Sequence, residues 1–192
     1  MSKRIVLLQA LASTPKDLAL MIKGMADAAI WQRPAPDQWA IINVINHLVY
    51  VERRYLKRLR QVLETERPSL PVIMPDETKH HTQVTLSELI ACFEETRGET
   101  VLFLKEVAPD CWQRTAVHET RGDVTFRFLV QFLVEHDINH LNQIAEIQQQ
   151  LHTSPKPNTQ PVIHKPTQEE SFISPGNLVN CPQIEVHNGR RD

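Results

Sequence analysis

The chain has 192 residues and a mass of 22.1 kDa, enough for one hydrophobic core at about 100–200 residues per domain. Acidic residues outnumber basic residues by 23 to 21. The chain therefore lacks the basic excess of proteins that bind a phosphate backbone, and we expect no nucleic-acid partner. No apolar run approaches the roughly 20 residues that cross a bilayer, so we expect no membrane association. Only 5 glycines favour a helical protein over a turn-rich β protein.

The cysteines and the N-terminal residues both indicate in which cellular compartment the protein is expected. There are 3 cysteines, an odd number, and none has the C-x-x-C spacing, which argues against a disulfide framework and against a cysteine-rich zinc site. Lys3 and Arg4 precede apolar residues as in a short signal peptide, but Gln9 interrupts that run before it reaches the usual length of about 7–15 residues. We therefore expect a cytoplasmic protein.

Apolar residues recur at helical spacing in four segments, which cover about residues 14–26, 40–64, 86–107 and 125–151. Thr14 can cap the first of these helices and Pro15 suits its first position, with a shorter helix ahead of it over residues 4–12. The third helix follows Thr85, whose spacing to Glu88 is that of a capping box.

The connecting segments and the C-terminal part differ from these helices in composition. Residues 65–84 are predicted to be a loop, and a Gly-Asp turn signal predicts a small hairpin within residues 112–124. Residues 153–192 contain 6 of the 13 prolines and no sustained periodicity. The fold is thus predicted to be all-α, with a four-helix bundle over residues 1–152 and a Pro-rich, extended or disordered tail over residues 153–192.

The fourth predicted helix carries the pattern that points to chemistry. His136 and His140 are four residues apart, so their imidazoles lie side by side, one turn apart on the helix. They occupy the apolar stripe, where aliphatic side chains are expected. Two adjacent buried imidazoles need a shared partner, and a metal ion is such a partner. His47, in the second helix, is a candidate third ligand, although a histidine hydrogen-bonded at the edge of the core would have the same pattern.

Other site classes are excluded by spacing. The ferritin-like di-iron set requires two Glu-x-x-His pairs, and the chain contains only one, Glu77 with His80. The chain also contains no His-Glu-x-x-His zinc protease motif, no P-loop, no GxGxxG and no serine in a nucleophile elbow.

Two segments, Trp39–Glu52 and His136–Ile144, resemble the DinB-like superfamily, which includes relatives of the bacillithiol and mycothiol S-transferases. Residues 33–37, Arg-Pro-Ala-Pro-Asp, also fit that family's pattern. The resemblance covers about residues 5–152. It implies a four-helix bundle, commonly a homodimer, that holds one divalent metal ion, zinc or nickel, on His47, His136 and His140.

The function expected from this resemblance is a metal-dependent enzyme, either a thiol S-transferase or a hydrolase, that acts on a low-molecular-weight thiol or another small molecule. Gln143 and Glu52 are candidates to hydrogen-bond around the metal ligands, whereas Asp137 is expected to be an ordinary solvated position. One alternative is a non-catalytic, metal-binding dimeric protein with a stress-related or interaction role. Another is a metal-free polar core around the histidines.

Overall fold

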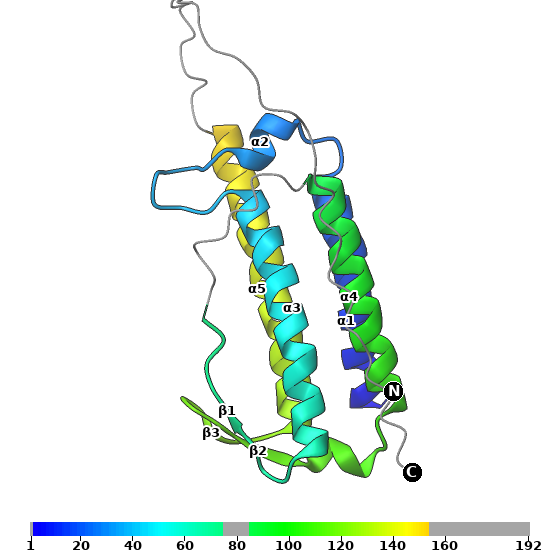
Figure 1. Cartoon of the computed structure of the whole chain (residues 1–192). Coiled ribbons are helices and arrows are strands. Elements are labelled where there is room, and N and C mark those ends of the chain that lie inside the picture. Colours follow the sequence, from blue (N-terminus) through cyan, green and yellow to red (C-terminus); the bar gives the residue numbers. More distant parts are fainter. Residues whose placement is uncertain (1, 75–84, 154–192) are drawn as a thin grey trace, which may run out of the picture. The chain divides into compact units, whose positions relative to one another are not determined.

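The structure is a computed structural model that describes residues 2–74 and 85–153 (Figure 1). The predicted tail therefore lies, apart from its first residue, outside the described residues. The helices are α1 (Lys3–Ile22), α2 (Asp27–Trp31), α3 (Ile41–Glu64), α4 (Leu86–Glu106) and α5 (Phe126–Thr153), with a 3-10 turn η1 at Asp110–Gln113. The strands are β1 (Ser69–Leu70), β2 (Thr115–His118) and β3 (Gly122–Thr125). The prediction of an all-α four-helix bundle is confirmed.

The four long helices form a bundle in which α1 and α3 each pack against both α4 and α5. Arg4, near the start of α1, donates hydrogen bonds to the carbonyls of Leu104 and Lys105 at the end of α4, so these two helices are antiparallel. Helices α3 and α4 run in the same direction (Figure 1). The end of α3 and the start of α4 therefore lie at opposite ends of the bundle.

The apolar core has two parts along the bundle axis. One contains the first half of α3 with the ends of α1 and α5, and the other contains the second half of α3 with the start of α5. Between them lies a level at which each long helix places a buried polar side chain: Thr14, Glu52, Arg97 and Asp137. We call these four residues the ionic cluster.

Helix α1 begins at Lys3, so the predicted start near Thr14 was wrong. Pro15 lies inside the helix and has no N–H to donate to the carbonyl of Leu11, one turn earlier. Arg97 Nη1 donates to that carbonyl instead, at 3.0 Å. A side chain from α4 thus replaces the missing backbone bond, and the helix continues through the proline.

Helix α1 is apolar along its length and contributes to both parts of the core. By length and composition it could cross a membrane, with a mean hydropathy of 1.4 over its best window. However, Leu11 and Leu18 are fully buried in the two parts of the core. One side of α1 is therefore packed in the core, whereas Ile5, Val6 and Leu20 are exposed.

The other helices match their predicted ranges closely. Thr85 Oγ1 accepts a hydrogen bond from the backbone N–H of Glu88 at 3.3 Å, and the Glu88 carboxylate accepts from the N–H of Thr85 at 2.7 Å. This reciprocal pair is the predicted capping box at the start of α4. Helix α2, of five residues, was not predicted.

A small sheet closes the end of the bundle where α3 and α4 terminate (Figure 1). β2 and β3 form the predicted hairpin, and Gly122 adopts a φ of 68° at the turn, a conformation that favours glycine. β1 adds to β2 in parallel, with Ser69 opposite Val117. This strand was predicted as loop, because two residues are too few for a periodic signal.

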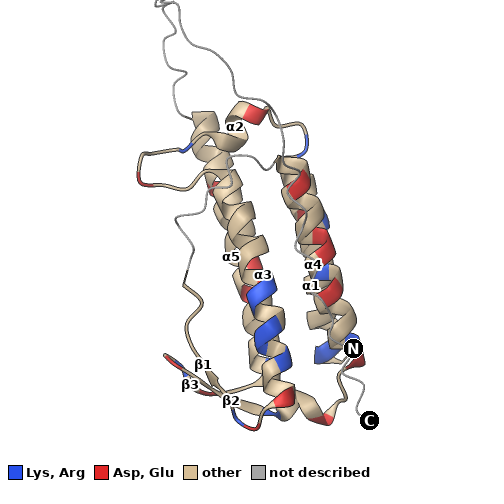
Figure 2. Cartoon of the chain, viewed as in Figure 1, with Lys and Arg blue, Asp and Glu red and all other residues tan. Residues whose placement is uncertain are grey.

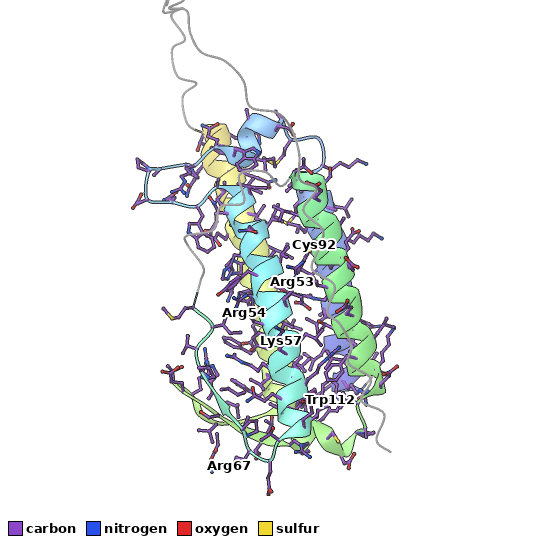
Figure 3. All side chains as sticks on the ribbon, viewed as in Figure 1. Arg53, Arg54, Lys57, Arg67, Cys92 and Trp112 are labelled. Atoms are coloured by element: carbon purple, nitrogen blue, oxygen red, sulfur yellow. The ribbon has the colours of Figure 1, made fainter. Side chains whose placement is uncertain are left out.

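Basic residues gather on the second half of α3 (Figure 2), where Arg53, Arg54 and Lys57 lie within two turns. Arg53 extends across to α4, and its Nη2 lies 2.8 Å from Sγ of Cys92 (Figure 3). The guanidinium therefore meets a half-buried cysteine thiol on the neighbouring helix.

Candidate metal centre

Three histidines from two helices meet at one point of the bundle. His47 lies in the second turn of α3, and His136 and His140 lie one turn apart on α5. His136 Nε2 is 3.2 Å from His47 Nε2 and also 3.2 Å from His140 Nε2. One nitrogen from each of the three half-buried rings lies within 4.8 Å of the others.

These contacts cannot all be good hydrogen bonds in a metal-free site. A neutral imidazole Nε2 carries either one hydrogen or one lone pair, and His136 Nε2 faces two other ring nitrogens at once. A cation that accepts all three lone pairs removes the conflict. A tetrahedral ion with metal–nitrogen bonds of about 2.0–2.1 Å would separate its ligand nitrogens by about 3.3 Å. The residues present therefore fit a divalent metal ion.

The electrostatics of the site keep the rings of His47 and His140 neutral. Burial and the neighbouring His140 and His136 rings lower the pKa of His47 to about 4. Burial and the His136 ring also lower the pKa of His140, although Gln143 and Asp137 oppose this shift. Since an imidazole binds metal only in its neutral form, these rings have free lone pairs at neutral pH.

Gln143 and Trp39 surround the outer side of the cluster. Gln143 Oε1 lies 2.8 Å from His140 Nδ1, which fits an Nδ1–H that donates to the amide and leaves Nε2 as the lone-pair atom. The Trp39 ring, in the residues before α3, lies edge-on to His47 at 5.2 Å and parallel to His140 at 6.4 Å between centroids. Gln143 thus contacts a metal-ligand candidate, as predicted from the sequence.

Glu52, the second such candidate, does not touch the histidines through any hydrogen bond in the described residues. Its Oε2 accepts from Arg97 Nη2 at 2.7 Å. Arg97 also forms an ion pair with Asp137, with Nη1 2.5 Å from Oδ2, and Thr14 Oγ1 donates to the same oxygen at 2.9 Å. Glu52 is therefore linked to the histidines indirectly, through Arg97 and Asp137.

The expectation that Asp137 is solvated was wrong, since its exposed fraction is 2 %. Its Oδ1 lies 4.0 Å from Nδ1 of His136, and that nitrogen has no hydrogen-bond partner among the described residues. Burial raises the pKa of the Asp137 carboxyl, but the His136 ring, Arg97 and Thr14 lower it by more. Asp137 is thus a buried carboxylate beside the ring nitrogen that faces away from the centre.

Sequence reasoning missed Arg97, whose exposed fraction is also 2 %. The pKa of its guanidinium, which burial alone would lower, is raised by Glu52 and Asp137. A signal was present: Arg97 follows the buried Phe93 by four residues, and Asp137 follows the buried Leu133 by four. Both charges stand where the helical spacing requires a core residue.

A cavity of about 420 Å³ adjoins the centre on the side of His140. It is lined by Asp37, Gln38, Trp39, His140, Gln143, Glu146, Ile147 and Gln150. Its size is within the range of small-molecule sites, about 300–1,000 Å³.

Comparison with known proteins decides the family. The model of the DinB superfamily matches residues 10–144. The chain belongs to the DinB superfamily. The predicted resemblance is thus confirmed.

Three proteins of known sequence or structure are similar to this chain. The uncharacterised protein YuaE of Bacillus subtilis (strain 168) is 21% identical over 145 residues, which cover 68% of this chain and 90% of YuaE. YfiT from Bacillus subtilis, described as a probable metal-dependent hydrolase with an unusual four-helix bundle topology, superposes with a TM-score of 0.71 at 21% identity, over 80% of this chain and 91% of YfiT. The DinB-like protein YjoA of the same organism superposes with a TM-score of 0.54 at 14% identity, over 78% and 94% of the two chains.

Proposed function

We propose that this DinB protein is a metal-dependent hydrolase whose divalent ion is held by Nε2 of His47, His136 and His140. The observation that carries the proposal is the convergence of these three nitrogens, 3.2 Å apart in two pairs, beside a cavity of about 420 Å³. The description of YfiT as a probable metal-dependent hydrolase supports the same reaction class.

The number of ligands favours an enzyme over a structural metal site. Within residues 2–74 and 85–153, the cluster contains three histidines and no fourth cysteine, histidine or carboxylate. Structural zinc sites are closed by four protein ligands, whereas catalytic sites hold three and leave one position for water or substrate. A purely structural zinc site would be expected to have a fourth protein ligand.

When bound, a zinc or nickel ion would supply Lewis acidity, which polarises a carbonyl and makes a water acidic near neutral pH. The chain's own residues prepare the site for that ion. Gln143 fixes the orientation of His140, and Asp137 lies beside His136. Trp39 packs against His47 and His140 and shields one side of the centre from water.

Thiol S-transfer is the other reaction that the same open position would allow, with a thiol sulfur in place of water. The two reactions differ in the second substrate. A hydrolase cleaves an ester or amide with water alone, whereas a transferase requires a low-molecular-weight thiol and an electrophile.

Metal content is the first test, on wild type, His136→Ala and the control His152→Ala, which removes an exposed histidine of the same helix. After reconstitution with zinc or nickel, mass spectrometry should find about one equivalent in wild type and control and almost none in His136→Ala. Ester and amide hydrolysis should then follow metal content. No metal in reconstituted wild type would overturn the proposal. Metal-dependent turnover only with a thiol present would establish the transferase instead, and bound metal with neither activity would establish the non-catalytic alternative.

A further inference from the structure

The cavity beside His140 has a distinct charge. Of its eight lining residues, Asp37 and Glu146 carry carboxylates, and none is a lysine or arginine within the described chain. Neither carboxylate has a hydrogen bond or ion pair with another described side chain. Arg33, in the same loop as Asp37, donates to the carbonyl of Pro36 and does not line the cavity.

Apart from His140, the remaining walls are three amides and two apolar groups. Gln38, Gln143 and Gln150 supply the amides, and Trp39 and Ile147 supply the apolar surface. A cationic group beside an indole face gains a cation–π attraction, and two carboxylates with no basic partner attract a cation and repel an anion.

We infer that the cavity binds a small substrate that carries an ammonium or related cationic group, attached through an apolar or aromatic portion to the bond that is cleaved. The inference rests on the proposed function, because it takes the three-histidine centre as the place of reaction. It also disfavours a polyanionic thiol as the second substrate, because the carboxylates of such a thiol would face Asp37 and Glu146.

Three hydroxamic acids that differ only in charge provide the probes: 4-(aminomethyl)-, 4-methyl- and 4-carboxybenzohydroxamic acid. The hydroxamate is the same metal-binding group in all three, so differences in Kd report the para substituent. Calorimetric titrations would use zinc-loaded and EDTA-stripped protein. We expect the ammonium probe to bind about fivefold more tightly than the methyl probe, and the carboxylate probe most weakly, as expected for exposed ion pairs.

The double variant Asp37→Asn/Glu146→Gln should bring the three Kd values within about twofold of one another, and 0.5 M NaCl should weaken the preference in wild type. The matched control is Glu106→Gln/Asp110→Asn, which removes the same charge at the sheet end of the bundle (Figure 1) and should preserve the order.

The two hypotheses fail in different ways. Equal Kd values for zinc-loaded and stripped protein would refute the metal centre. The effect of probe charge is tested separately, by comparing the Kd values of the three probes within one form of the protein. A carboxylate probe that binds as tightly as the ammonium probe, an order that persists in the double variant, or no binding of any probe would each overturn the cationic-substrate inference.

Discussion

At the residue scale, the lowered pKa of His47 makes folding depend on pH. Because the pKa falls from 6.5 to about 4 on folding, the unfolded chain takes up a proton below pH 6.5 that the folded chain refuses. We therefore expect the metal-free protein to lose stability steadily between pH 6.5 and pH 4. Urea unfolding in EDTA across this range would measure the loss, and His47→Gln should reduce the slope. If His47→Gln left the dependence of the unfolding free energy on pH unchanged, the pKa of His47 in the folded protein would be the same as in the unfolded chain.

Asp137 allows a second test, of how a residue that touches no metal ligand through a hydrogen bond affects the centre. Asp137→Asn keeps the volume but removes the negative charge 4.0 Å from His136 Nδ1. Residues that support metal ligands typically contribute about 10- to 100-fold to metal affinity, so we expect a loss of that size in a competition with a chromophoric chelator. The control is Glu135→Gln, which removes an exposed charge beside His136 in sequence. If both variants lost the same metal affinity, the effect of Asp137 would be explained by net charge alone.

At the element scale, the helices were predictable because each carries a regular apolar stripe. In α3 the stripe includes Ile45, Leu48, Tyr55 and Leu59, and the position between the second and third of these is Glu52. The paired histidines of α5 were equally visible from their spacing. The long α1 was less predictable, since Pro15 is tolerated there only because Arg97 from another helix satisfies the carbonyl of Leu11. No local signal in α1 reports a donor that arrives from 86 residues away.

The partners within the ionic cluster depend on the topology, which the sequence alone does not reveal. Each long helix contributes one polar residue to the ionic cluster, but which polar residues meet depends on the heights at which the helices pack. Because α3 and α4 run in the same direction, Glu52 and Arg97 come to the same level beside Asp137. The metal-ligand candidates could be predicted from helical periodicity and a family resemblance alone. The contacts of the ionic cluster could be identified only once the packing of all four helices was known.

At the scale of the whole molecule, the ionic cluster joins all four long helices between the two parts of the apolar core. Arg97 is its centre, since it bonds to Glu52, Asp137 and the carbonyl of Leu11. Two buried carboxylates without this cation would repel each other in a medium of low dielectric constant. The stability of the bundle should therefore depend on Arg97 far more than on any exposed arginine.

Arg97→Met tests this dependence, because methionine fills much of the space and removes only the charge and its bonds. Removal of one partner from a buried ion pair typically costs about 3–5 kcal/mol, so we expect the free energy of unfolding to fall by that amount. Arg54→Met, an exposed position on α3, should change it by less than about 0.5 kcal/mol. The triple variant Glu52→Gln/Arg97→Met/Asp137→Asn should recover part of the loss, because no uncompensated charge remains buried. A triple variant less stable than Arg97→Met would show that the carboxylates contribute bonds of their own rather than a charge that Arg97 must balance.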